Sequence, residues 1–316
     1  MKKLFYSTIG FVIIVLVAQI LIGRYLMTPI PEMALIKTDL EEKYQVIYFG
    51  DSVLYTVAPT DTDKSTIPQM LSKILPGESI ANFSHGAYHL GIYDSYVKYI
   101  ARSSDKPQAI IVPINLAEFS PGWDMQPGYQ FDEENFDLTT DIPFASYFFR
   151  PLAIFQAIHA VTNDQFMSTP VYRGTTRIGT VADFIRPPID PVDVPRYMGN
   201  QFVFDYMYNL EPNQRKLLSL EDLIQRAQKA GIAVDIYITP IDYQNGIKYA
   251  GPDFLPQVKA NTELICTIVK TYNIPCLNLA FTLPSSVFNY PVYPNEHLKQ
   301  QGRMFVATQV AETFFK

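Results

Sequence analysis

Short apolar runs recur along this chain, and a segment with helical periodicity follows each of them. We expect these runs to be strands at 45–49, 79–83, 109–114, 232–239 and 276–281. Strand-to-helix alternation of this kind is typical of a mostly parallel sheet with helices on both faces. The expected fold class is therefore α/β, a flavodoxin-like three-layer sandwich. Hydrophobic residues make up 48% of the 316 residues, which is enough for a large core.

The alternation breaks over residues 116–210, where prolines and aromatic residues are frequent. A stretch of roughly ninety residues is far longer than an ordinary connection between two elements. We interpret it as an insertion after the third strand that shapes a substrate surface, with a helix within 144–161. The α/β domain, insertion included, is expected to span 44–316.

The N-terminal part of the chain contains an uncharged stretch over residues 4–23, which two lysines precede. A helix of about 20 apolar residues is long enough to cross a bilayer core of roughly 30 Å. A cleaved signal peptide is the alternative, but the stretch lacks a small-x-small cleavage site and a lipobox cysteine. We expect residues 1–24 to be an uncleaved anchor in the bacterial cytoplasmic membrane and 25–43 to be a connector. The basic flank predicts a cytoplasmic N-terminus and an extracytoplasmic domain.

Charge and cysteine content narrow the classes of function. The net charge is −6, from 25 basic and 31 acidic residues, so nucleic-acid binding has no electrostatic support. The two cysteines, Cys266 and Cys276, have no His or Cys at metal-ligand spacing, and we predict no metal and no cofactor. They would pair in an oxidising compartment or remain two buried thiols, and the sequence leaves both alternatives open.

Polar residues follow the expected strands at the edge where parallel sheets place their sites. A Gly-Asp-Ser corner ends the first strand and presents Ser52; Gly86 follows the second strand and Asn115 the third. His297 precedes the final helix. These residue types suit acyl transfer, with Ser52 as nucleophile and His297 as the base that takes and returns its proton. The Ser52 and Gly86 N–H groups and the Asn115 amide would hold the oxyanion.

The same residues have structural interpretations. Gly-Asp-Ser is ordinary turn chemistry, and Ser52 would then only cap a helix. Asn115 would be a turn residue at a strand end, and Gly86 would be needed only for its backbone angles. His297 would be a surface histidine at a helix start.

The order of these blocks resembles the SGNH (GDSL-like) hydrolase superfamily over about residues 45–316. The matching blocks are Gly-Asp-Ser, Asn-x-x-x-Gly ending at Gly86, a strand-ending Asn115, and a late His-Leu at His297. The resemblance implies an α/β fold and a serine esterase or acyltransferase activity. Asn115 stands in Pro-Ile-Asn-Leu, whereas the family usually has Gly-x-Asn-Asp.

The acid of the family's Asp-x-x-His motif is missing, because Pro294 stands three residues before His297. Either a backbone carbonyl orients His297, leaving a Ser–His dyad, or another carboxylate does so. Glu296 and Asp242 are the candidate carboxylates.

The anchor, the extracytoplasmic domain and the insertion resemble a narrower group within that superfamily. Its members act beside membrane-bound O-acyltransferases, among them polysaccharide O-acetylation proteins and the teichoic-acid D-alanylation partner. This resemblance implies that a cell-surface polysaccharide or acylated polymer is the substrate, that the acyl group is acetyl, and that a membrane-bound O-acyltransferase is the partner.

Two alternatives belong to other functional classes. A non-catalytic SGNH-like domain would bind the polymer or scaffold the acyltransferase, and a Ser52–His297 separation beyond hydrogen-bond reach would favour it. A phospholipid or lipoprotein esterase is the other alternative, suggested by the anchor and the aromatic insertion.

Overall fold

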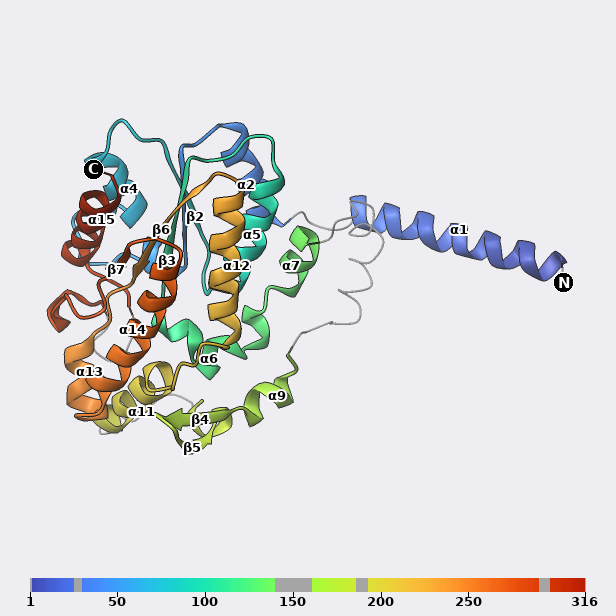
Figure 1. Cartoon of the computed structure of the whole chain (residues 1–316). Coiled ribbons are helices and arrows are strands. Elements are labelled where there is room, and N and C mark those ends of the chain that lie inside the picture. The colour runs from blue at the N-terminus through green and yellow to red at the C-terminus, as the bar shows by residue number, and fades with distance from the viewer. Residues whose placement is uncertain (1, 26–29, 140–160, 186–192, 290–295, 316) are drawn as a thin grey trace.

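A five-stranded sheet forms the centre of the protein, as a computed structural model shows (Figure 1). The structure describes residues 2–25, 30–139, 161–185, 193–289 and 296–315. The strand order is β2-β1-β3-β6-β7, and each pairing is parallel. The strands are β1 (Val46–Gly50), β2 (Ile80–Ser84), β3 (Ala109–Ile114), β6 (Ala233–Ile238) and β7 (Cys276–Asn278). The mostly parallel α/β sheet expected from the alternation is therefore confirmed.

Helices cover both faces of the sheet, with α4 and α15 on one side and α5 and α12 on the other (Figure 1). These elements are α4 (Ile67–Ile74), α5 (Leu90–Arg102), α12 (Arg215–Lys229), α14 (Phe254–Thr271) and α15 (Gln300–Phe314). Side chains of β1 alternate between the two faces: Ile47 and Phe49 join the apolar cluster of α5, α12 and α14. Val46 and Tyr48 join the cluster of α4 and α15. This alternation follows from the two-residue period of a strand.

Two strands differ from what their sequence suggests. Pro113 lies within β3, a central strand, although proline cannot donate to a ladder. The ladder between β3 and β1 ends at Ile111, so Pro113 lies beyond it and only the β6 side is still paired. The strand β7 is shorter than the expected 276–281, because the Asn278 side chain accepts from Ala280 N at 3.0 Å and turns the chain.

The segment 116–210 contributes no strand to the main sheet among its described residues. It contains η1 (Leu116–Phe119), α6 (Pro121–Asp124), η2 (Pro127–Tyr129), α7 (Asp132–Thr139), α9 (Asn163–Ser168), the strands β4 (Pro170–Arg173) and β5 (Thr176–Thr180), α10 (Val181–Phe184) and α11 (Val194–Tyr206). The two strands pair antiparallel as a separate hairpin. The helix expected within 144–161 falls, up to residue 160, outside the described residues.

The first helix, α1 (Lys2–Tyr25), exposes many large apolar side chains, Leu4, Phe11 and Ile14 among them. Over the part of the chain that the structure describes, no helix combines the length and the apolar character that crossing a membrane requires. The next helix, α2 (Pro31–Glu41), lies within the expected connector and starts at a proline. Proline is tolerated there because the first turn has no use for its N–H.

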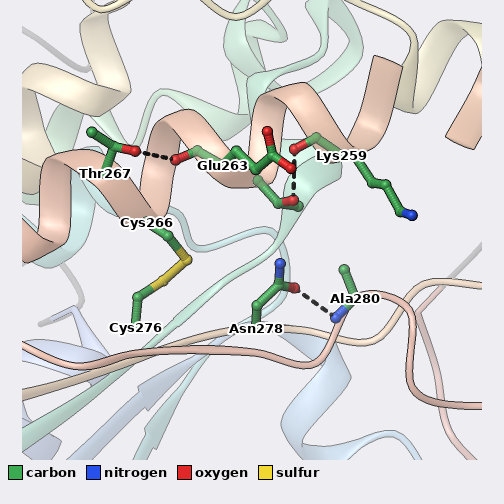
Figure 2. Close-up of a disulfide and its surroundings, with 8 residues drawn as sticks. Lys259, Glu263, Cys266, Thr267, Cys276, Asn278 and Ala280 are labelled. Atoms are coloured by element: carbon green, nitrogen blue, oxygen red, sulfur yellow. Dashed lines mark hydrogen bonds between the residues drawn. A yellow bond between two sulfur atoms is a disulfide. The ribbon is translucent and has the colours of Figure 1, made fainter. Parts of the chain in front are cut away.

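Cys266 and Cys276 form a disulfide, which decides between the two alternatives that the sequence left open (Figure 2). The bond joins α14 to β7, the strand at one edge of the sheet. Three further short elements complete the description: α3 (Ser52–Tyr55), α13 (Tyr243–Ala250) and η4 (Ser285–Val287).

Candidate active site

Ser52 is the first residue of α3 and directly follows the corner that ends β1. Asp51 caps this short helix, since its Oδ1 accepts from Val53 N at 2.8 Å. A Cβ on Gly50 would lie 1.4 Å from Leu54 Cδ1, so glycine is what allows α3 to fold back against the strand end. The corner therefore fixes the backbone position of Ser52.

His297 lies next to Ser52, with Nε2 3.0 Å from Ser52 Oγ. When the neutral imidazole carries its proton on Nδ1, Nε2 accepts the hydrogen bond from the serine hydroxyl. Burial lowers the pKa of His297 below its usual 6.5, so the ring is neutral at neutral pH. A neutral imidazole in contact with a serine hydroxyl is the arrangement that a general base requires.

The backbone on both sides of His297 is held by the segment after η4. Asn289 N donates to His297 O at 2.8 Å, and Lys299 N donates to Val287 O at 2.8 Å. Phe288 and Leu298 form an isolated antiparallel bridge between these two bonds. His297 thus sits on a two-stranded connection rather than on a free loop.

Arg303 fixes the same region from α15, and its side chain is fully buried. Its guanidinium donates to Leu298 O at 2.9 Å and to Asp61 Oδ2 at 2.7 Å. It also donates to Ser65 O at 3.0 Å and to Asp63 O at 2.8 Å. Arg303 was not among the residues predicted from the sequence, although a charged residue on the apolar side of an amphipathic helix was a usable signal.

Gly86 follows β2 and lies beside the Ser52 corner. The neighbouring strands bring it there, because Gly50 is in register with Ser84 and His85 N donates to Gly50 O at 3.1 Å. Within the described residues, neither the Ser52 N–H nor the Gly86 N–H donates to a protein acceptor. Two backbone donors are therefore available beside the serine, as an oxyanion requires.

Asn115 also reaches this edge of the sheet, but its amide is already engaged. Its Nδ2 donates to Asp51 Oδ2 at 2.7 Å and lies 3.4 Å from Glu296 Oε2. Its Oδ1 accepts from Ala117 N at 3.0 Å. An amide carries two N–H groups, so Asn115 can serve an oxyanion only after it leaves one of the two carboxyl groups.

Glu296 precedes His297 in the sequence and is buried. Its side chain is hydrogen-bonded to residues other than His297. Its Oε1 accepts from Tyr206 OH at 2.6 Å, and its Oε2 faces Asn115. The pKa of Glu296 is raised to about 7, because the effect of burial exceeds the lowering by the Tyr206 hydrogen bond. Burial likewise raises the pKa of Asp51 to about 6. The amide of Asn115 thus lies between two carboxyl groups that hold protons more readily than usual.

Asp242, the other candidate for orienting His297, caps a helix. Its side chain accepts from Asn245 N at 3.2 Å and from Asn245 Nδ2 at 2.7 Å at the start of α13. It is also hydrogen-bonded to Ser285 Oγ. Pro294, where the family's acid would stand, lies outside the described residues.

Two residues of α11 were not predicted from the sequence: Tyr206, which is buried, and Asp205, which is half-buried. Desolvation of its carboxyl and the nearby charge of Glu296 raise the pKa of Asp205 well above its usual value. Nothing local marks either residue, because the partner of Tyr206 is ninety positions away. Among the described residues, no group of His, Cys, Asp or Glu has an arrangement that could hold a metal ion.

The comparisons with known proteins carry no family assignment. No protein-family model matches the chain, and no curated protein matches it. One similar solved structure is a possible lipase from Chitinophaga pinensis, with a TM-score of 0.41, 12% identity, and coverage of 85% of this chain and 97% of that one. Another is the salicylyl-acyltransferase SsfX3 from a tetracycline biosynthetic pathway, with a TM-score of 0.36, 11% identity, and coverage of 85% and 53%. This chain spans about half of the second protein.

Proposed function

We propose that this protein is a serine esterase or O-acyltransferase of SGNH-hydrolase type that forms an acyl-enzyme on Ser52. The observation that carries the proposal is the 3.0 Å contact between Ser52 Oγ and His297 Nε2, two residues 245 positions apart. The contact lies at the carboxyl edge of a parallel sheet, where such folds place their sites. The strand order, with β1 between β2 and β3, is that of flavodoxin-like sheets and supports the SGNH assignment.

The proposed reaction proceeds in two steps. Ser52 Oγ attacks the ester carbonyl carbon while His297 Nε2 takes the hydroxyl proton, and the carbonyl π electrons move to the oxygen. The Ser52 and Gly86 N–H groups stabilise that oxyanion, with Asn115 as a further donor if its amide is released. Collapse expels the alcohol, which takes the proton from His297. Water or a sugar hydroxyl then removes the acyl group by the reverse route.

The substrate and the location are also proposals. We infer a cell-surface polysaccharide or related acylated polymer as the substrate, acetyl as the acyl group, and a membrane-bound O-acyltransferase as the partner. These inferences rest on the resemblance described above. A single-pass anchor within residues 1–24 would place the domain outside the bacterial cytoplasmic membrane. The Cys266–Cys276 disulfide supports that placement, because disulfides persist in oxidising compartments.

The orientation of His297 remains part of the proposal. Glu296 and Asp242 hydrogen-bond other groups, so we favour a Ser–His dyad over a triad built from either. A Ser52–His297 separation beyond hydrogen-bond reach would have favoured the non-catalytic alternative, and the 3.0 Å separation supports the catalytic one instead.

The test is active-site labelling with a fluorophosphonate probe. The wild-type protein should be labelled at Ser52, Ser52→Ala should lose the label, and Ser72→Ala should keep it. Ser72 is a suitable control because it is a half-buried helical serine whose hydroxyl, within the described residues, donates only to Pro68 O. A folded wild type that takes no label, or equal labelling of Ser52→Ala, would refute the proposal. An acetyl-ester assay with and without a glycan acceptor then separates hydrolysis from transfer.

A further inference from the structure

We propose that the Tyr55 hydroxyl is a donor to the oxyanion that forms on the substrate, a catalytic role that rests on the proposed function of Ser52. The feature that suggests it is the position of this hydroxyl directly over Gly86. Tyr55 then completes a set of three donors with the Ser52 and Gly86 N–H groups.

Tyr55 belongs to the same helical turn as Ser52. Residues three apart lie on one side of a helix, so the two side chains leave α3 in similar directions. Val53 and Leu54 point the other way and are buried, whereas Tyr55 is 39% exposed. The corner that presents Ser52 therefore presents Tyr55 as well.

The Tyr55 hydroxyl faces the second backbone donor. A Cβ built on Gly86 would lie 3.1 Å from Tyr55 Oη, and no other non-neighbouring atom of the described residues lies within 4 Å of it. Glycine at this position therefore lets the hydroxyl lie close to the backbone of residue 86. An oxyanion held by Gly86 N–H would form beside that hydroxyl.

The hydroxyl proton of Tyr55 is available for donation. Among the described residues, Tyr55 Oη makes no hydrogen bond, in contrast to the buried pair Tyr48 and Tyr237, whose hydroxyls bond each other at 2.8 Å. Burial and the negative charge of Asp51 raise the pKa of Tyr55 above its usual 10.0. The phenol therefore keeps its proton at neutral pH and acts as a donor.

Asn115 is the other side chain suited to this role, and its bonding explains why a further donor is needed. Both of its N–H groups point at carboxyl groups, of Asp51 at 2.7 Å and Glu296 at 3.4 Å. Releasing either bond would leave a buried acceptor unpaired, at a cost of about 1–3 kcal/mol. Tyr55 can donate without breaking an existing bond.

The chemical step leaves Tyr55 unchanged. Ser52 Oγ bonds to the carbonyl carbon, the π electrons of the carbonyl move to its oxygen, and the serine proton goes to His297 Nε2. Tyr55 donates a hydrogen bond to that oxygen and keeps its proton. The bond strengthens as negative charge develops, so it lowers the barrier more than it improves substrate binding.

The test compares Tyr55→Phe with Tyr172→Phe, a matched tyrosine of β4 that is also 39% exposed. Two readouts are measured: the second-order rate of Ser52 phosphonylation by a fluorophosphonate, and the affinity for a trifluoromethyl ketone, which forms a tetrahedral alkoxide on Ser52. We expect Tyr55→Phe to lower both by about 10- to 100-fold. The wild type and Tyr172→Phe should agree within about twofold, and thermal unfolding of all three should be alike.

The outcomes separate the two proposals. If the wild type is labelled at Ser52 and Tyr55→Phe reacts and binds the ketone equally well, the role of Tyr55 is overturned and the proposed function stands. A weaker reversible binding of probe with an unchanged rate of bond formation would also overturn it, because a transition-state donor acts on the rate. A folded wild type that takes no label overturns both proposals.

Discussion

Replacing Arg303 with methionine would remove a buried cation while keeping most of its apolar volume. Arg303 is 0% exposed, and the side chain of its partner Asp61 is 6% exposed. The guanidinium ties the loop of Asp61, Asp63 and Ser65 to Leu298 through four hydrogen bonds. The substitution therefore disrupts both the loop and the backbone that carries His297.

The expected cost follows from the charge left behind. Removing one partner of a buried ion pair typically costs about 3–5 kcal/mol, since the other charge stays buried without compensation. The carbonyls of Asp63 and Ser65 belong to half-buried residues that water can reach, so they add little. We expect the Arg303→Met protein to lose about 3–5 kcal/mol of its free energy of unfolding.

The measurement is urea denaturation of four proteins: wild type, Arg303→Met, Asp61→Asn and the double variant. The loss of stability in the double variant should be smaller than the sum of the losses in the single variants. The reason is that Asp61→Asn removes the carboxylate charge that Arg303→Met leaves buried and unpaired. Labelling of Ser52 by a fluorophosphonate should slow in the Arg303→Met protein under conditions where it is folded, because Leu298 is adjacent to His297.

A surface pair supplies the control. Arg196 and Asp193 lie 2.7 Å apart, but their side chains are 65% and 50% exposed, so Arg196→Met should cost about 0–1 kcal/mol. A loss below 1 kcal/mol for Arg303→Met, or strict additivity with Asp61→Asn, would refute the reasoning that a buried charge pair holds this region together.

Two further predictions concern the base and the disulfide. The labelling rate of Ser52 should rise with pH to a plateau, with a half-point below 6.5, because burial lowers the pKa of His297 and only the neutral ring accepts a proton; a half-point above 6.5 would contradict this. Replacing Cys266 and Cys276 with serine should cost about 2–3 kcal/mol in urea unfolding, the entropy of closing a loop of about ten residues, and leave labelling intact. Unchanged unfolding would contradict that cost.

The strands of the main sheet were predictable because their signal is local. A buried parallel strand reads as a short apolar run, and each expected run corresponds to a strand of the structure. Two exceptions depend on backbone hydrogen bonding and not on the pattern of apolar residues. Pro113 is accommodated because one ladder ends before it, and β7 ends early because Asn278 bonds to the chain just after it. Neither of these two features can be predicted from hydrophobic periodicity.

The sequence was sufficient to predict that Ser52 and His297 lie at the same edge of the sheet. The carboxyl ends of parallel strands meet at one edge, so polar residues after different strands are brought close together. The 3.0 Å contact between Ser52 and His297 agrees with that reasoning. The roles proposed for Gly86 and Asn115 stay predictions until activity is measured.

Hydrogen-bond partners lay beyond the reach of the sequence. Arg303 bonds to residues about 240 positions away, Tyr206 to a carboxyl ninety positions away, and Asn115 to two carboxyl groups at once. Sequence separation carries no information about which buried donor meets which acceptor, because that pairing depends on the packing of whole elements. The pKa values of Asp51 and Glu296 follow from that burial and not from their sequence neighbours.

The sequence by itself determined the α/β class, the strands and the Gly-Asp-Ser corner, since each follows from the local pattern of apolar and turn-forming residues. The tertiary structure alone decided which side chains surround the Gly-Asp-Ser corner. It placed His297 against Ser52, turned the amide of Asn115 toward two carboxyl groups, and left the Tyr55 hydroxyl facing Gly86. These choices follow from the directions in which folded elements point their side chains, and short-range pattern cannot specify those directions.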